Sequence, residues 1–130
     1  MNKPKFENEV ARIFIDTKVK LIRIEWITAP TSPEFREVMS RVLALLTENK
    51  FTRLIGDVRH LGAVAEEDQH WSNATWFPEA LESGINKIGI IVSDDIFSQL
   101  SVEEIMSRVD NAELSSHYFS SPEEAMSWIK

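Results

Sequence analysis

The sequence predicts one α/β domain over residues 1–130, with a mixed β-sheet that starts as an N-terminal antiparallel hairpin and continues through βαβαβα units. Three observations support this fold class. The chain has 130 residues, enough for one hydrophobic core. Two strand-like segments near the N-terminus are joined by a turn too short for a parallel return. Later apolar runs without alternation are separated by helical patterns, which is typical of parallel strands buried on both faces.

The hairpin occupies the first part of the chain. Its first strand is expected over about Val10–Asp16, followed by the polar turn Asp16-Thr17-Lys18. In the second strand apolar and charged residues alternate: Ile22, Arg23, Ile24, Glu25 and Trp26. A period of two predicts a strand with one buried face and one solvated face.

The first helix is marked by its cap and by its apolar stripe. Ser32 is the expected N-cap, and Pro33 suits the first helical position because the N–H that it lacks would have no partner there. Apolar residues then recur at helical spacing: Phe35, Val38, Met39, Val42, Leu45 and Leu46. The stripe predicts one buried face, and Asn49-Lys50 ends the helix.

Two short apolar runs, Leu54–Val58 and Ile88–Val92, are the expected central parallel strands. The segment between them is expected to be helical over about Glu66–Trp76. Pro78 either breaks this helix or begins a second short helical turn, which Gly84 ends.

The last third of the chain is expected to add a helix, a strand and a helix. Ser101-x-x-Glu104 has the pattern of a capping box and predicts a helix that opens there and ends near Val109. Glu113–Phe119 is a weaker strand. The segment Ser121-Pro122-Glu123-Glu124 is a second capping box and opens the final helix. The predicted order is therefore β-β-α-β-α-β-α-β-α.

This order of elements resembles the STAS superfamily, and most of all the small bacterial SpoIIAA-like proteins, also called STAS/SEC14-domain proteins. The resemblance covers nearly the whole chain and rests on these residues: Leu54–Val58, Trp71 and Trp76-Phe77-Pro78, Ile90–Val92 with Asp95 and Phe97, and Phe119-x-Ser121-Pro122-Glu123-Glu124-Ala125-x-x-Trp128. It implies the SpoIIAA-like fold and a non-enzymatic regulatory or protein-interaction module in the bacterial cytoplasm.

Two properties of the family are not expected here. In the phosphorylated anti-anti-sigma proteins a serine follows the strand equivalent to Leu54–Asp57, whereas residues 57–65 of this chain contain neither Ser nor Thr. We therefore expect no phosphorylation switch in that loop. SEC14 proteins carry lipids in a larger domain, and at this length a deep lipid cavity is not expected.

Composition excludes several classes of protein. The absence of cysteine excludes disulfides, zinc ribbons, iron–sulfur clusters and thiol nucleophiles. The net charge of −7 argues against nucleic-acid binding. No apolar run approaches the roughly 20 residues of a membrane helix and no export signal opens the chain, so we expect a cytoplasmic protein without membrane insertion.

Charge is unevenly distributed along the chain. Residues 1–60 carry 11 Lys and Arg against 8 Asp and Glu, whereas residues 61–130 carry 3 against 13. Either this is ordinary solubilising surface, or the acidic half meets a basic surface. Together with the surplus aromatic residues it predicts association with another protein or with a second copy, as a homodimer.

Catalytic motifs do not occur in the chain. The glycine-rich nucleotide-binding loops and the nucleophile elbow of hydrolases are missing, so we expect neither an enzyme nor a cofactor. Glu67-x-x-His70 is half of a di-metal motif, and no metal is predicted. Asp57 ends a predicted central strand as a receiver phosphoacceptor would, but the acidic pair and the lysine that such chemistry needs are not at the matching places.

Candidate binding residues follow from position, because ligands of open α/β sheets bind beyond the carboxyl ends of the strands. The candidates are Asp57, Arg59, His60, His70, Trp71, Asp94 and Asp95. They predict a polar crevice for a small ligand. The alternative is that Asp57 pairs with Arg59 and that one of the later aspartates caps a helix.

Trp71 and Trp76 lie five positions apart, which separates them by about 140° around a helix. Both therefore cannot face one narrow core stripe, and Trp76 is the better core candidate. Two functions stay open. The first is a protein-interaction module that works through Trp71 and the loop after Asp57. The second is a small-ligand-binding protein that uses the polar crevice.

Overall fold

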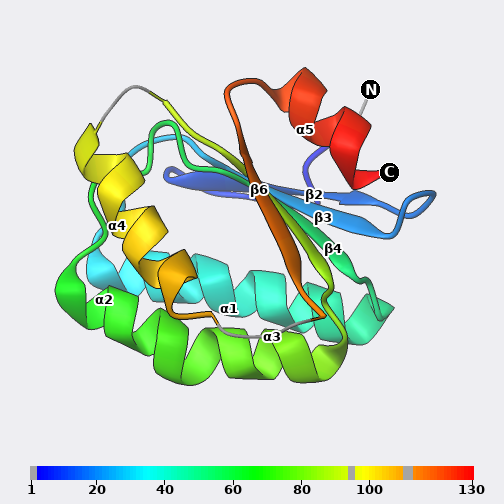
Figure 1. Ribbon diagram of the computed structural model, residues 1–130, viewed down its shortest axis with the longest axis horizontal. Helices are drawn as coiled ribbons and strands as arrows, with labels where there is room; N and C mark the ends of the chain where they lie inside the picture. The colour runs from blue at the N-terminus through cyan, green and yellow to red at the C-terminus, as the bar shows by residue number, and fades with distance from the viewer. Residues whose placement is uncertain (1–2, 94–95, 110–112) are drawn as a thin grey trace.

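The computed structural model describes residues 3–93, 96–109 and 113–130 (Figure 1). Six strands form one sheet: β1 (Phe6–Glu7), β2 (Ala11–Asp16), β3 (Leu21–Trp26), β4 (Arg53–Asp57), β5 (Lys87–Ile91) and β6 (Ser115–Phe119). The helical segments are α1 (Ser32–Asn49), α2 (Glu66–Trp71), the π-helical turn η1 (Ser72–Trp76), α3 (Phe77–Ser83), α4 (Ile96–Ser107) and α5 (Pro122–Ile129).

The strands lie in the sheet in the order in which they occur in the chain. β1, β2 and β3 are antiparallel neighbours, and β3 to β6 are parallel neighbours. This confirms the predicted α/β fold with an opening antiparallel hairpin. The two-residue strand β1 was not predicted, because so short a segment shows no periodicity.

The order of the strands decides where the helices lie. Each parallel strand is added on the same side of the previous one, and right-handed crossovers then place every connecting helix on one face of the sheet. Figure 1 shows α1, α2, α3 and α4 on that face, which we call the helical face; among the helices of the described residues, α5 is the one on the opposite face. The opposite face is therefore covered over only part of its width.

Two separate apolar cores follow from this arrangement. The larger core lies between the sheet and the helical face and includes Ile13, Ile24 and Trp76. The smaller core joins Leu21 and Ile55 of the sheet to α5. The alternation predicted for residues 22–26 is confirmed, because Ile22, Ile24 and Trp26 are buried while the charged residues between them are only half-buried.

Two helix starts differ from the prediction. Thr31, and not Ser32, is the N-cap of α1: its hydroxyl accepts from the Glu34 N–H and the Glu34 carboxylate accepts from the Thr31 N–H, which forms a capping box. The prediction that Ser101 opens the next helix was wrong. α4 already begins at Ile96, and the Ser101 hydroxyl instead accepts a hydrogen bond at 3.0 Å from the backbone N–H of Val64.

Pro78 does not break the segment over residues 66–83. The chain stays helical through it, but the turn before the proline widens to a π-helix, in which the Phe77 N–H donates to the Ser72 carbonyl. Proline has no N–H for the carbonyl four residues earlier and its ring crowds that carbonyl, so a widened turn accommodates it. The widened turn faces the larger core.

Candidate functional site

An apolar cavity of about 90 Å³ lies inside the larger core, between the sheet and the helical face. Its walls come from β3, β4 and β5 on one side and from α1, η1, α3 and α4 on the other. Almost all of the wall is apolar. Protein interiors are normally packed as densely as organic crystals and hold few voids larger than a water molecule. This space is therefore a distinct feature of the fold.

Gly56 is the reason that the sheet side of the cavity is open. It sits in the middle of β4 and lines the cavity. A methyl group at this position would meet no atom within 4 Å. Its backbone is not among the positive-φ glycines, so other residues can adopt the same conformation. The glycine is thus required by neither the backbone nor close packing.

The π-helical turn forms part of the opposite wall. Ser72 and Trp76 both line the cavity and both are buried. Their polar atoms are already used inside the protein: the Ser72 hydroxyl donates to the Asp68 carbonyl at 2.8 Å, and the Trp76 indole N–H donates to the Met39 carbonyl at 2.6 Å. A ligand in the cavity would therefore meet mainly aliphatic side chains, the aromatic side chains of Trp26, Phe35, Trp76 and Phe77, and the thioethers of two methionines.

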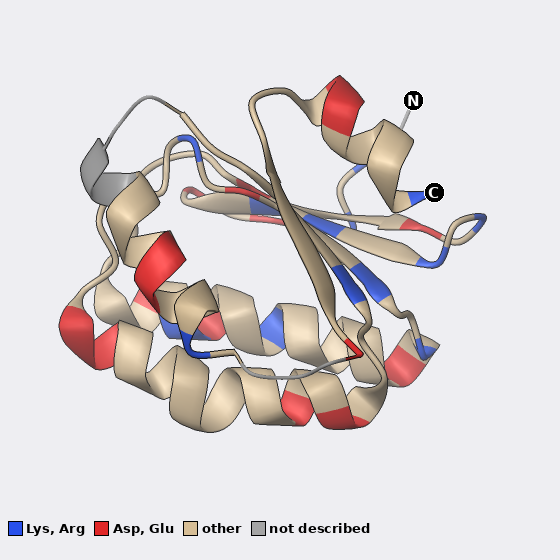
Figure 2. Ribbon diagram, viewed as in Figure 1, with Lys and Arg blue, Asp and Glu red and all other residues tan. Residues whose placement is uncertain are grey.

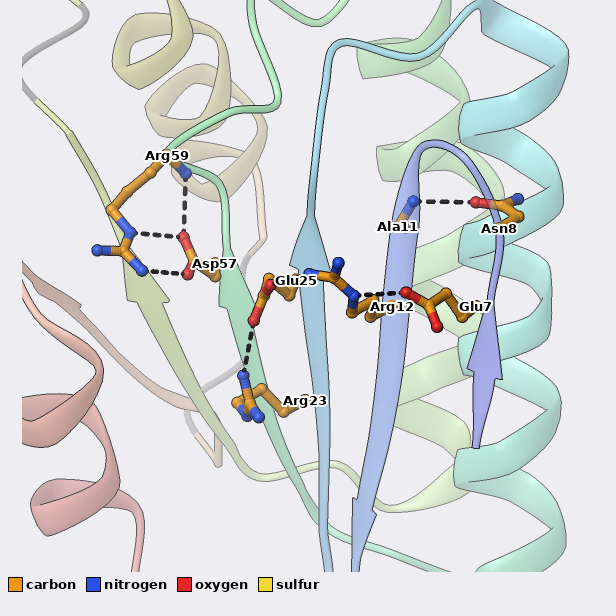
Figure 3. Close-up of polar contacts among 8 residues, drawn as sticks. All are labelled: Glu7, Asn8, Ala11, Arg12, Arg23, Glu25, Asp57 and Arg59. Carbon is orange, nitrogen blue, oxygen red and sulfur yellow. Dashed lines mark hydrogen bonds and ion pairs between the residues drawn. The ribbon is translucent and has the colours of Figure 1, made fainter. Parts of the chain in front are cut away.

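Asp57 and Arg59 lie together on the opposite face of the sheet, at the carboxyl end of β4 (Figure 3). The Asp57 side chain is buried and accepts from the Arg59 guanidinium at 3.0 Å and 2.7 Å and from the Arg59 backbone N–H at 3.2 Å. These hydrogen bonds hold the pKa of Arg59 above its ordinary value. The structure thus shows the Asp57–Arg59 pair that the sequence offered as an alternative to a ligand site.

Further ion pairs continue across the part of this face that α5 leaves open (Figure 3). Arg12 bridges Glu7 at 2.6 Å and Glu25 at 2.8 Å, and Arg23 reaches Glu25 at 3.2 Å. The Arg23 guanidinium also lies 4.0 Å from the centre of the Phe14 ring. Figure 2 shows basic and acidic positions along these strands, and the ion pairs above join three arginines to three carboxylates. The open face is therefore charged but internally balanced.

Trp71 and its surroundings join α2 to the start of α1. Asp68 is buried and accepts from the Ser32 hydroxyl at 2.7 Å and from Arg36 at 2.8 Å. The Arg36 guanidinium lies 5.4 Å from the Trp71 ring, which also meets Phe35 edge-on with ring centroids 6.2 Å apart. Trp71 is half-buried, whereas Trp76 is only 1% exposed, as the sequence predicted for Trp76.

The remaining candidates are scattered. His60 is exposed in the loop after β4, and His70 is exposed on α2, beside a surface groove that also involves Glu66 and Arg108. α2 packs on the helical face, whereas the Asp57–Arg59 pair lies on the other face, so the structure does not bring the α2 candidates to that pair. Asp94 and Asp95 lie outside the described residues.

Sequence reasoning missed the residues that define the cavity. It read Gly56 only as part of a buried strand, although a glycine in the middle of such a strand is a recognised sign of unusual packing. It also missed the buried carboxylate of Asp68, because both side-chain partners lie more than 30 positions away in the chain. Pro78 was expected either to break the helix or to begin a second short helical turn, and it lies in the first turn of α3, which ends at Gly84 as predicted; only the π-helical turn before it was not predicted.

The described residues show neither a metal site nor a membrane-spanning helix. Within the described ranges no group of three His, Asp or Glu side chains could hold a metal ion. No helix there combines the length and the apolar character of a membrane span. Comparison with protein-family models, curated proteins and solved structures finds no match to this chain. The resemblance to STAS proteins therefore stays a prediction.

Proposed function

We propose that this protein binds a small apolar ligand in the cavity between its sheet and its helical face. The observation that carries the proposal is the open space beside Gly56, in the middle of a central strand. A binding role is in keeping with the ligand-binding alternative from the sequence, but it places the ligand in the core and not in the polar crevice.

The cavity has a free-energy cost that the fold could avoid. Residual cavity volume destabilises a protein by about 24 cal/mol per Å³, so a cavity of about 90 Å³ corresponds to about 2 kcal/mol. A single substitution at Gly56 would remove part of this cost without backbone strain. Proteins often keep features that lower stability where function requires them, so a cavity retained at this cost supports a binding role.

The size and chemistry of the cavity define the class of ligand. Apolar cavities of about 150 Å³ stay dry and take up benzene or xenon. The present cavity is smaller, so it suits a short run of methylene groups or a small apolar molecule more than a lipid with its headgroup. Its wall supplies no unpaired hydrogen-bonding group from Ser72 or Trp76, which disfavours polar ligands.

The test is a thermal-shift titration with straight-chain alcohols of increasing length and with small aromatic molecules. A ligand that binds only the folded state stabilises it by about 2.7 kcal/mol at 100 times its Kd, so a saturable rise in Tm is expected. The matched control is Gly56→Val, whose side chain suits a strand and projects into the cavity. The variant should be at least as stable as the wild type but lose the ligand-dependent shift. Equal shifts in both proteins would contradict the proposal.

The resemblance to STAS proteins supports a second candidate, a cytoplasmic regulatory or protein-interaction module. The observation that favours it is the surface beside Trp71, where this half-buried aromatic ring borders a groove shared with Arg36 and His70. Tryptophan and arginine are the residues most often found at the energetic centres of interfaces. Purification of the tagged protein from native cells tests this second candidate. We expect a partner protein to copurify with the wild type and with Gly56→Val, but not with Trp71→Ala.

A further inference from the structure

The last strand of the sheet is an edge without the usual protection. β6 pairs with β5 on one side, and no other described strand lies on its second side (Figure 1). Its sequence, Ser-Ser-His-Tyr-Phe, contains no lysine, no acidic residue and no proline. Four of its five residues are exposed. Natural proteins usually blunt such an edge with charges, proline, a bulge or a covering segment, because it is a template for another strand.

The opposite edge of the same sheet shows the contrast. β1 has only two residues, it follows Pro4 and Lys5, and it carries Glu7 in an ion pair with Arg12. Short length, proline and charge are the devices that prevent pairing with another chain. The molecule therefore protects one edge of its sheet and leaves the other one ready for pairing.

The register of β6 identifies the backbone groups that face outward. The Ser115 N–H donates to the Asn86 carbonyl at 2.9 Å, and the Phe119 carbonyl accepts from the Val92 N–H at 2.9 Å. Residues of a parallel strand alternate in the direction of their backbone groups. Ser115, His117 and Phe119 therefore face β5, and the N–H and C=O groups of Ser116 and Tyr118 point away from the sheet.

We propose that two copies of this chain associate through antiparallel pairing of their β6 strands. When Ser116 of one copy lies opposite Tyr118 of the other, four outward-facing residues exchange four hydrogen bonds. The two-fold axis that relates the two copies then passes between their His117 residues, which lie opposite each other as a close pair without backbone hydrogen bonds between them. A second copy is the favoured occupant, because an antiparallel pair of identical strands is self-complementary in this register and neither strand adds a charge.

The side chains around β6 extend this contact on both faces of the sheet. The two exposed large apolar residues of the described chain are Tyr118 and Leu100. Burial raises the pKa of Tyr118, and the charge of Glu103 on α4 raises it further. Leu100 precedes Glu103 by three positions on α4, so it faces the same way. On the other face His117 meets Trp128 edge-on, with ring centroids 4.8 Å apart.

The experiment is sedimentation equilibrium of the full chain, of two charge variants and of their mixture. The wild type should reach twice the chain mass of 14.9 kDa as concentration rises. Like charges placed directly opposite each other destabilise a strand pair. His117→Lys and His117→Glu should therefore each be monomeric alone. Mixed in equal amounts, they should restore the dimer, because lysine then faces glutamate across the axis.

Two further variants separate this geometry from a general surface effect. Ser116→Pro removes an outward N–H without touching the bonds to β5, so it should abolish the dimer while circular dichroism stays unchanged. Lys50→Glu, on the exposed end of α1, should leave the dimer intact. Each copy has a net charge of −7, so the dimer should become stronger as salt screens that repulsion.

Two results would overturn the proposal. The first is a wild type that stays monomeric at the highest concentration tested, which is also the result expected if a strand of another protein occupies this edge. The second is a dimer that survives both Ser116→Pro and His117→Lys. The ligand-binding proposal is independent of either result, because the cavity lies on the helical side of the sheet and contains no residue of β6.

Discussion

Replacing Gly56 by alanine should make the protein more stable, although substitutions at buried glycines commonly destabilise. The new methyl group enters the cavity without meeting an atom within 4 Å. Burial of one methyl or methylene group contributes about 0.8 kcal/mol. A glycine in the middle of a strand also costs about 0.5–1 kcal/mol in backbone entropy relative to alanine. The expected gain in the free energy of unfolding is therefore about 1.3–1.8 kcal/mol.

Urea denaturation followed by tryptophan fluorescence measures this gain. The transition midpoint should rise by roughly 0.5–1 M with an unchanged m value, and Tm should rise by roughly 3–6 °C. Gly84→Ala is the matched control, because Gly84 ends α3 at a φ of 111° and its substitution should destabilise. If Gly56→Ala is less stable than the wild type, the claim that an open cavity lies beside Gly56 is wrong, and so is the stability gain derived from it.

Four other substitutions test the polar and aromatic contacts by the same denaturation assay. Arg59→Ala should lower the free energy of unfolding by about 1–3 kcal/mol, because it leaves the buried Asp57 carboxylate without its cation. The loss is limited because the arginine side chain is partly exposed to solvent. Trp76→Ala should lower the free energy of unfolding by about 3–5 kcal/mol, because Trp76 is buried. Trp71 is half-buried, so Trp71→Ala should lower it by only about 1–2 kcal/mol. Equal losses in the two variants would contradict this difference in burial. Ser101→Ala should cost about 1–3 kcal/mol by removing the acceptor of a loop N–H, and an unchanged midpoint would show that this bond contributes nothing.

The elements that could be predicted from sequence are those whose signal is local. The hairpin, the two central strands and the first helix each follow from periodicity or from a cap within a few residues, and the structure confirms them. Threonine and serine are both favourable N-cap residues, so the cap type alone does not distinguish Thr31 from Ser32. Thr31 is the N-cap because it forms the capping box with Glu34.

The features that could not be predicted depend on distant parts of the chain. Ser101-x-x-Glu104 has the pattern of a helix start, but the hydroxyl serves the N–H of Val64, 37 positions away. The cavity lies where β4, η1 and α4 meet. The packing density between three such elements cannot be predicted from a local sequence pattern. No sequence pattern indicated the apolar cavity, because its walls come from residues that are distant in the chain.

The most direct test of ligand binding in the core is a crystal structure of the protein under xenon pressure, because xenon enters apolar cavities without needing a hydrogen-bonding partner. We expect a xenon atom in van der Waals contact with Gly56 and Trp76 in the wild type, and none at this place in Gly56→Val. A wild-type cavity that contains ordered water, or that takes up no xenon while other sites do, would contradict the proposal that the core of this protein is built to hold an apolar ligand.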